Sequence, residues 1–339
     1  SVTKKKKEEL LERLKQGEID ILIGTHALLE ENVVFQNLGL VVTDEQHRFG
    51  VRQRSTIASK GNHPDVLVMT ATPIPRTLAL ILYGDLDISI IDELPPNRKK
   101  IETYAVTPEL EDRLNGFVKK QIDMGRQAYI VCPLVEENEE IAAKSVMELA
   151  EKYKKEVFSE YRVEYIHGKM RPKEKDQIMQ EFKDGKIQIL VSTTVIEVGV
   201  NVPNASIMII QNAERFGLAQ LHQLRGRVGR GEYQSYCILK YESHSKVVKE
   251  RMKIMQQTND GFIIAEKDLE LRGSGEFFGT RQHGLPEFKI ANLFEDLPIL
   301  KKVQAIAAQI EREDPQLKLE KNAKLKALVQ EKFQDRIEI

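Results

Sequence analysis

Residues 40–47 read LVVTDEQH, and this stretch decides the fold. An apolar run precedes two adjacent carboxylates, which is typical of a parallel strand that is buried on both faces. In parallel sheets, ligands bind at the carboxyl ends of the strands. Asp44 is therefore a candidate for holding the waters of a Mg²⁺ ion. Glu45 is a candidate for orienting a water molecule for attack on a γ-phosphate.

A second motif, QLHQLRGRVGRG at residues 220–231, carries two arginines three positions apart. Arg227 and Arg230 each follow a glycine, and Gln223 lies four residues before the first of them. A phosphoryl group that is being transferred carries negative charge on several oxygen atoms, and guanidinium groups bind such oxygens well. With the carboxylate pair, these arginines predict a nucleoside triphosphatase whose site closes between two lobes. The alternative is a surface turn that is merely rich in Gly and Arg.

The composition limits the possible classes of protein. A chain of 339 residues with 41% hydrophobic residues is expected to form about two packed domains rather than a disordered polymer. The 51 Lys and Arg residues nearly cancel the 52 Asp and Glu residues, so any contact with nucleic acid must use local patches. Cys132 and Cys237 are expected to be buried, reduced thiols. No apolar run approaches the length needed to span a membrane.

Short apolar runs alternate with stretches of helical spacing along most of the chain. The predicted strands are residues 19–23, 38–43, 66–69, 101–106, 128–131, 163–166, 187–191, 205–210 and 235–239. Helices are predicted at residues 5–16, 109–124, 141–155, from Pro172 onward, and at 218–224. This alternation predicts a parallel three-layer α/β fold.

After residue 243 the pattern becomes helical. Residues 247–257 and 262–271 predict a helical hairpin whose second helix ends at the sequence RGSG, residues 272–275. Further helices are expected at residues 297–311 and 319–334.

Several motifs resemble those of superfamily 2 helicases. TATPIPRT at residues 70–77 is similar to motif III, STTVIEVGVNVPNA at 192–205 to motif V, and QLHQLRGRVGRG to motif VI. IDELPPNR at residues 91–98 and AEKDLELRGSGEFFGTRQHG at 265–284 favour the RecG family of bacterial ATP-dependent DNA helicases. The second of these strings resembles the translocation motif of that family. The transcription-repair coupling translocase carries close versions of the motifs and stays an alternative.

The resemblance implies a fold and an activity. The fold would consist of two RecA-like lobes, with a C-terminal part of the first lobe at residues 1–95 and the second lobe at 96–243. A helical hairpin with the translocation motif would occupy 244–290, and C-terminal helices 291–339. The activity would be ATP- and Mg²⁺-dependent translocation on branched double-stranded DNA, which remodels stalled replication forks and Holliday junctions. A monomer in the bacterial cytoplasm, without a membrane partner, is expected.

One departure from the family pattern concerns the phosphate-binding loop. No G-x-x-x-x-G-K-[ST] string occurs in the sequence, so the lysine and backbone amides of such a loop are missing from it. We therefore expect the chain to be a C-terminal portion that lacks the family's N-terminal wedge domain and the front of the first lobe. For the isolated chain, a non-enzymatic module that binds DNA or protein is the alternative.

The resemblance also implies roles for individual residues. Residues expected to couple nucleotide state to movement are Gln46, His47, Thr70, Thr72, Gln223 and Glu197. Thr70 and Thr72 follow a predicted strand, so their hydroxyls could reach the DEQH side chains, although a helix N-cap is the alternative role. Residues expected to contact DNA or to drive translocation are Thr25, Gly168, Lys169, Ser192, Thr193, Arg272, Arg281 and Gln282. For the arginines of the translocation motif, solvent-exposed positions without a function are the alternative.

Overall fold

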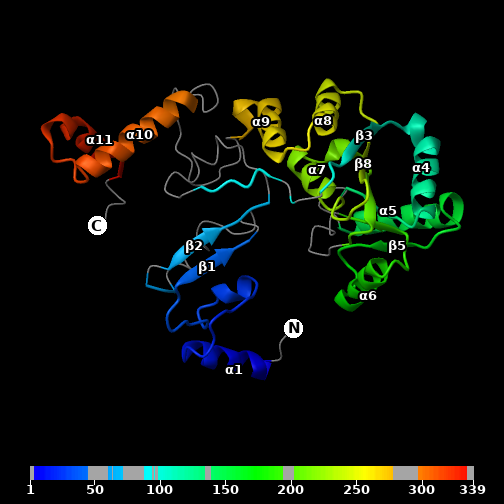
Figure 1. Cartoon of the computed structure of the whole chain (residues 1–339), viewed down its shortest axis with the longest axis horizontal. Helices are drawn as coiled ribbons and strands as arrows, with labels where there is room; N and C mark the ends of the chain where they lie inside the picture. Colours follow the sequence, from blue (N-terminus) through cyan, green and yellow to red (C-terminus); the bar gives the residue numbers. More distant parts are fainter. Residues whose placement is uncertain are drawn as a thin grey trace. The chain divides into compact units, whose positions relative to one another are not determined.

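The computed structural model describes residues 4–44, 60–62, 64–71, 88–93, 95, 98–133, 139–193, 202–277 and 297–333. The chain divides into two compact units. One unit comprises Ser1–Ile74 and Asp92–Leu271, and the other comprises Pro75–Ile91 and Arg272–Ile339. Figure 1 labels the helices and strands. The four domain ranges expected from the sequence stay predictions.

A six-stranded parallel sheet forms the centre of the first unit. Its strands are β3 (Glu102–Val106), β4 (Gln127–Val131), β5 (Val163–Ile166), β6 (Ile189–Ser192), β7 (Ala205–Ile210) and β8 (Tyr236–Lys240). Their order across the sheet is β3-β8-β7-β4-β6-β5, and every neighbouring pair is parallel. Each of these strands coincides, within two residues at either end, with a run predicted from the sequence.

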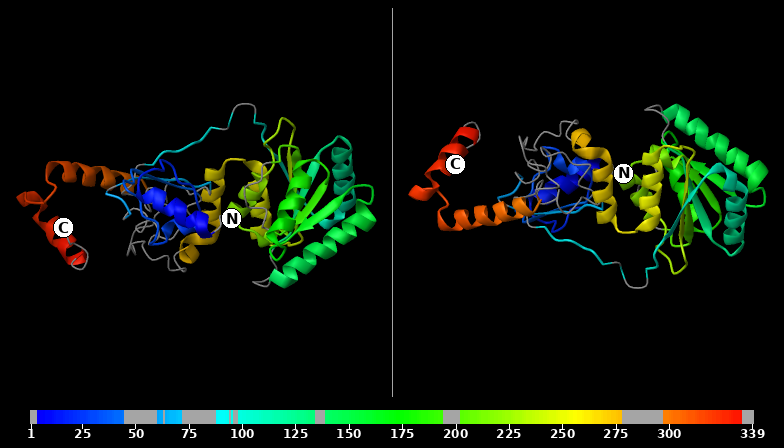
Figure 2. Two further views of the ribbon diagram at one scale, coloured as in Figure 1. Left: turned by 90° about the horizontal axis from the view of Figure 1, so that it is seen from below. Right: turned by 90° about the horizontal axis from the view of Figure 1, so that it is seen from above.

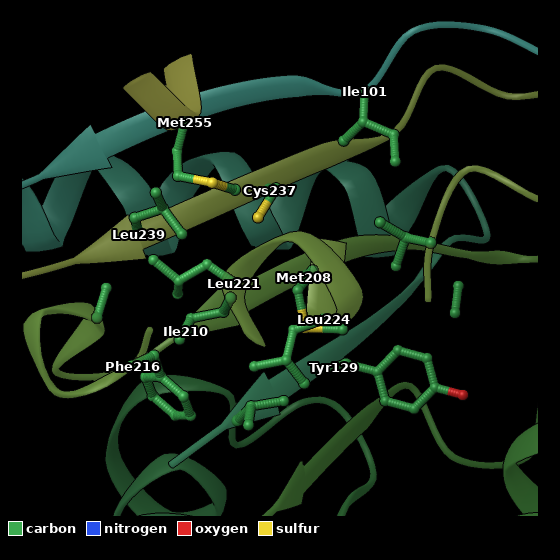
Figure 3. Close-up of a cluster of buried hydrophobic side chains, with 14 of the residues drawn as sticks. Ile101, Tyr129, Met208, Ile210, Phe216, Leu221, Leu224, Cys237, Leu239 and Met255 are labelled. Atoms are coloured by element: carbon green, nitrogen blue, oxygen red, sulfur yellow. The ribbon is translucent and has the colours of Figure 1, made fainter. Parts of the chain in front are cut away.

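Helices cover both faces of this sheet (Figure 2). They are α4 (Glu111–Asp123), α5 (Glu139–Lys152), α6 (Pro172–Lys183), α7 (Leu218–Arg225), α8 (Lys246–Gln257) and α9 (Gly261–Phe277). Along β4, Tyr129 and Val131 pack into a core shared with α6, α7, α8 and α9, whereas Ala128 and Ile130 pack against α4 and α5. Figure 3 shows the first of these cores. The predicted three-layer α/β fold is confirmed.

The amino-terminal part of the chain is a smaller assembly. It contains α1 (Lys4–Lys15), a 3-10 turn η1 (His26–Leu29) and two parallel strands, β1 (Leu40–Thr43) and β2 (Asp65–Val68). The expected burial of the DEQH strand on both faces is wrong. Val41 is buried, but Leu40 and Val42 are 58% and 52% exposed, because a strand is buried on both faces only where other elements cover both.

The strand predicted at residues 19–23 is also wrong. These residues form no strand, and Ile21 and Ile23 are 80% and 91% exposed. Strand structure requires a neighbour that accepts and donates backbone hydrogen bonds. An apolar run of five residues indicates the propensity for a strand but does not supply this neighbour.

The helix at the translocation motif differs from its prediction. Helix α9 continues through residues 272–275 to Phe277, so the RGSG sequence does not end it. Ile264, Ala265 and Leu269 of this helix are buried. Their packing outweighs the cost of about 1 kcal/mol for each glycine within a helix.

The remaining elements are α10 (Leu297–Glu313), a 3-10 turn η7 (Glu320–Asn322) and α11 (Ala323–Phe333). The predicted last helix therefore starts with a 3-10 turn and becomes α-helical only at Ala323. The Asp314 carboxylate accepts hydrogen bonds from the backbone N–H groups of Lys318 and Leu319, at 2.7 and 2.9 Å, and so holds the turn between the helices. Over the described ranges, no helix combines the length and the apolar character that crossing a membrane requires.

Candidate functional site

The carboxyl ends of β1 and β2 bring two predicted site residues to one sheet edge. Thr43 pairs with Val68, and the backbone N–H of Met69 donates to the carbonyl oxygen of Thr43 at 2.8 Å. Asp44 and Thr70 follow directly, and both side chains are exposed. The chain thus places the start of DEQH beside the start of TATPIPRT, with the Asp44 carboxylate accessible to a hydrated cation.

The loop between α7 and β8 carries the predicted arginine pair. Val228 is fully buried and anchors the loop between the two arginines. Gly229 has a φ of +76°, and a Cβ atom there would lie 2.9 Å from Cγ1 of Ile101. A Cβ atom at Gly231 would lie 2.3 Å from the carbonyl oxygen of Pro203. Glycine is therefore required at both positions for the loop to lie against the sheet.

The two arginines present positive charge from this fixed loop. Arg227 is partly buried and Arg230 is exposed. Burial raises the pKa of the Tyr129 phenol, and the positive charges of Arg230 and Arg227 partly oppose that rise. Tyr129 is the central residue of β4. The arrangement is a cationic loop that could stabilise developing charge on a phosphoryl group.

Arg225 is a functional candidate that the sequence analysis missed. Its side chain is 1% exposed and its Nη1 donates to the carbonyl oxygens of Met255 and Thr258 at 2.8 and 2.9 Å. These carbonyls belong to the C-terminal end of α8, where backbone acceptors lack partners within the helix. The i, i+3, i+7 spacing of Leu218, Leu221 and Arg225 places it on the buried face of α7, and this was the available signal. Arg225 thus ties the arginine loop to the helical hairpin.

His222 completes this buried connection. Its Nδ1 lies 3.2 Å from Nη2 of Arg225. Burial, followed by the positive charge of Arg225, lowers the pKa of His222 to about 4. Burial also lowers the pKa of Arg225. His222 is therefore neutral near pH 7 and can accept a hydrogen bond from the guanidinium.

The carboxyl ends of β5 and β6 gather four residues predicted to contact DNA. Gly168 and Lys169 follow β5 and are exposed, whereas Ser192 ends β6, Thr193 follows it, and both are buried. Lys169 forms an ion pair with Glu140 at 2.6 Å. The carbonyl oxygen of Gly168 accepts a hydrogen bond from Nζ of Lys175 at 2.5 Å. The groups that an incoming phosphate would meet first are therefore the Gly168 amide and the Lys169 ammonium.

The arginine loop and the predicted DNA contacts lie at opposite ends of the strands of the six-stranded sheet. The loop is at the amino ends, and the predicted DNA contacts are at the carboxyl ends. The loop precedes β8, whereas Gly168 and Lys169 follow β5, and all strands run in one direction. Strands of four to six residues separate the two ends by roughly 13–20 Å, at about 3.3 Å per residue. The length of the strands therefore separates the two predicted binding sites.

Several predicted site residues lie elsewhere. Thr25 is exposed and precedes η1, with its carbonyl oxygen accepting from the Leu28 N–H at 3.0 Å. Gln223 lies on α7, and Arg272 lies within α9 rather than at the predicted bend. The positions that fall outside the described residues are Glu45, Gln46, His47, Thr72, Glu197, Arg281 and Gln282. In the described part of the chain, no group of three or more His, Cys, Asp or Glu side chains is arranged to hold a metal ion.

The chain is similar to known helicases in family, sequence and structure. Residues 1–81 match the DEAD/DEAH box helicase model, residues 110–232 the helicase conserved C-terminal domain, and residues 258–337 the C-terminal part of domain 3 of the ATP-dependent DNA helicase RecG. The chain is 55% identical over 314 residues to the ATP-dependent DNA helicase RecG of Bacillus subtilis, covering 93% of this chain and 46% of that protein. It is 51% identical to RecG of Streptococcus pneumoniae, covering 92% of this chain and 47% of that protein.

A solved structure of RecG bound to a three-way DNA junction is also similar. It aligns with a TM-score of 0.66 and 48% identity, covering 88% of this chain and 38% of that one. The chain thus spans about half the length of the curated relatives that it matches.

The parallel three-layer fold and the matches to the DEAD/DEAH box and helicase C-terminal models place the chain among the superfamily 2 helicases. The two models match separate parts of the chain, residues 1–81 and 110–232. The chain belongs to the RecG family of ATP-dependent DNA helicases.

Proposed function

We propose that the full-length protein containing this chain is an ATP-dependent translocase that remodels branched double-stranded DNA, such as stalled replication forks and Holliday junctions, in the bacterial cytoplasm. The observation that carries the proposal is the placement of an arginine loop at the amino ends of the strands and of the exposed Gly168 and Lys169, which are suited to binding phosphate, at the carboxyl ends. A motor needs such a separation, because hydrolysis at one site must alter the grip on DNA at the other. The solved relative bound to a three-way DNA junction supports branched DNA as the substrate.

ATP hydrolysis would depend on positioning and electrostatics. Asp44 would hold the waters of Mg²⁺, which when bound neutralises phosphate charge. Glu45 would orient the attacking water, and Arg227 and Arg230 would stabilise the charge that develops on the γ-phosphoryl group. The residues that would relay nucleotide state are Gln46, His47, Thr70, Thr72, Gln223 and Glu197.

DNA binding would use backbone phosphates rather than base edges. The Gly168 amide and Lys169 would supply one contact. On the adjacent strand end the backbone of Ser192 and Thr193 is already hydrogen-bonded, so a second contact would use the Thr193 hydroxyl, which is buried and has no hydrogen-bond partner in the described part of the chain. Thr25 would touch the DNA from the first lobe. Contacts of this kind give affinity that falls with salt and shows little sequence preference.

Movement would be transmitted through the hairpin of α8 and α9. Arg225 connects the α7 end of the arginine loop to the carbonyl oxygens at the end of α8, and Asn259 in the turn donates to the carbonyl oxygen of Ile101 at 3.2 Å. A shift of the loop on hydrolysis would therefore displace the hairpin. Arg272, Arg281 and Gln282 of the translocation motif would convey this displacement to duplex DNA.

The test is a strand-separation assay with the full-length protein as a monomer, ATP and Mg²⁺. A three-way junction and a linear duplex of the same base composition are compared in 50 and 200 mM salt. The proposal predicts that the junction is processed, that the linear duplex is not, and that junction affinity falls steeply with salt. Equal processing of both substrates would contradict the proposed specificity for branched DNA. Binding to RNA polymerase would instead favour the transcription-repair coupling translocase.

For the chain by itself, we propose a binding role without turnover. The sequence contains no G-x-x-x-x-G-K-[ST] string, so the groups that normally hold the β- and γ-phosphates are missing from it. Hydrolysis of ATP by the chain alone would contradict this assignment and would require a phosphate-binding group that the motifs do not identify.

A further inference from the structure

Tyr233 and Arg126 form a stacked pair beside the arginine loop, and no role has been assigned to either residue. The guanidinium carbon of Arg126 lies 3.1 Å from the centroid of the Tyr233 ring. Arg126 directly precedes β4, and Tyr233 lies three residues after Arg230 in the segment that leads into β8. In the sheet, β7 lies between β4 and β8. The pair therefore spans the amino end of β7.

Hydrogen bonds fix the backbone on both sides of this pair. The Asn204 side chain donates to the carbonyl oxygen of Gly125 at 2.7 Å, which holds the turn before Arg126. The Gln234 side chain donates to the carbonyl oxygen of Lys100 at 2.8 Å, and the Glu102 N–H donates to the carbonyl oxygen of Ser235 at 3.0 Å. The ring is thus presented from a rigid sheet edge rather than from an unsupported loop.

The Tyr233 side chain remains open although one ring face is covered. Tyr233 is 46% exposed, and the guanidinium can occupy only one of its two faces. A ring held flat by a cation on one side offers its other face to a planar partner. Planar nucleobases stack on such aromatic faces with little regard to their identity.

The position of the pair indicates which nucleobase it would meet. Like Arg227 and Arg230, the pair lies at the amino ends of the strands. The groups suited to DNA phosphates lie at the carboxyl ends, roughly 13–20 Å away. Three residues of extended chain, at about 3.3 Å each, allow up to about 10 Å between Arg230 and Tyr233. This is comparable to the reach of a nucleotide from its terminal phosphate to its base.

We propose that the Tyr233–Arg126 pair is the stacking platform for the adenine base of the bound nucleotide. The inference rests on the proposed ATPase function and adds to it a base-binding subsite on the second lobe. It makes Tyr233 a nucleotide-binding residue and Arg126 the positioning residue that holds the ring.

The test compares wild type, Tyr233→Ala and Tyr233→Phe in the full-length protein. Loss of the ring should weaken ADP binding and raise KM for ATP by about tenfold, with kcat unchanged at saturating ATP, because a stacked base contributes to binding rather than to chemistry. Tyr233→Phe keeps the ring and should behave as wild type. Arg126→Ala should give an intermediate loss of ADP affinity. Inorganic tripolyphosphate, which has no base, should bind all four proteins equally.

Any of three results would overturn the inference. One is an ADP affinity in Tyr233→Ala equal to that of the wild type. Another is loss of junction DNA affinity with ADP affinity retained, which would assign the platform to a DNA base. A reduced affinity for tripolyphosphate in Tyr233→Ala would also count against it, because the whole site would then be distorted. If the wild-type protein shows no DNA-stimulated ATP hydrolysis, the proposed function itself fails, and this is distinguishable from all three results.

Discussion

At the scale of single residues, the buried Arg225 stabilises the fold through hydrogen bonds to backbone carbonyl oxygens. Its guanidinium satisfies two carbonyl oxygens at the end of α8 and contacts Oγ1 of Thr103 at 3.3 Å. Arg225→Met retains the apolar stem but leaves these acceptors without donors. We expect the free energy of unfolding to fall by about 2–4 kcal/mol, measured by chemical denaturation. Arg225→Lys should lose less, since one ammonium group can still reach one carbonyl; equal stability of all three proteins would contradict this role.

His222 predicts a pH dependence of stability. Its folded-state pKa is about 4, below the ordinary value of 6.5, because of burial and the charge of Arg225. Between these values the unfolded chain binds a proton that the folded chain does not, so this contribution to stability is full above pH 6.5 and is lost as the pH falls toward 4. The loss should reach about 3 kcal/mol at most.

The measurement is the free energy of unfolding of wild type and His222→Gln between pH 4 and 7. The wild type should lose more stability than the variant as the pH falls, because only the wild type has this titrating group. Carboxylates titrate in both proteins and cancel in the difference. Parallel pH curves would show that His222 does not contribute.

At the scale of elements, the arginine loop depends on the close approach of its glycines to the sheet. Gly231→Ala places a Cβ atom 2.3 Å from the carbonyl oxygen of Pro203 and should displace the loop. We expect at least a tenfold loss of DNA-stimulated ATP hydrolysis in the full-length protein, since misplacing catalytic groups by about 1 Å costs about 100-fold.

Gly226→Ala is the matched control in the same loop. Its Cβ atom would lie 3.4 Å from the carbonyl oxygen of Gln223, and Gly226 has an ordinary helical φ of −67°. Hydrolysis and thermal stability should stay close to wild type. Equal losses in the two variants would mean that the approach to Pro203 does not determine the loop position.

The elements also show how far the sequence could predict this molecule. Apolar runs identified the central strands β4, β6 and β7, because strands buried on both faces are apolar throughout. The edge strands β3 and β5 are partly exposed and include polar residues, and their β-branched and aromatic residues identified them. The spacing of Arg227 and Arg230 identified the arginine loop, but Arg225 escaped notice because its partners are backbone carbonyls 30 or more residues away. The strand expected at 19–23 and the helix end expected at 272–275 were wrong because pairing and packing, rather than local propensity, determine them.

At the scale of the whole molecule, an exposed apolar surface on β1 and β2 affects behaviour in solution. Leu40 and Val42 point to one face, and the register pairs Val42 with Leu67, which is 51% exposed. Contiguous apolar surface of this kind promotes association. We expect this chain to self-associate with rising concentration in sedimentation experiments, and Val42→Thr with Leu67→Thr to reduce that association. Identical sedimentation of the two proteins would contradict this expectation.

The proposed function depends on the arginine loop, which would stabilise the charge that develops on ATP during hydrolysis. The most direct measurement is the rate of ATP hydrolysis by the full-length protein, with and without branched DNA, for wild type and Arg230→Ala. Arg230 is exposed and anchors no core contact, so its removal should leave folding, ADP binding and junction binding unchanged. We expect the DNA-stimulated rate to fall by about 10³-fold or more. A variant that hydrolyses ATP at the wild-type rate would contradict this role of the loop.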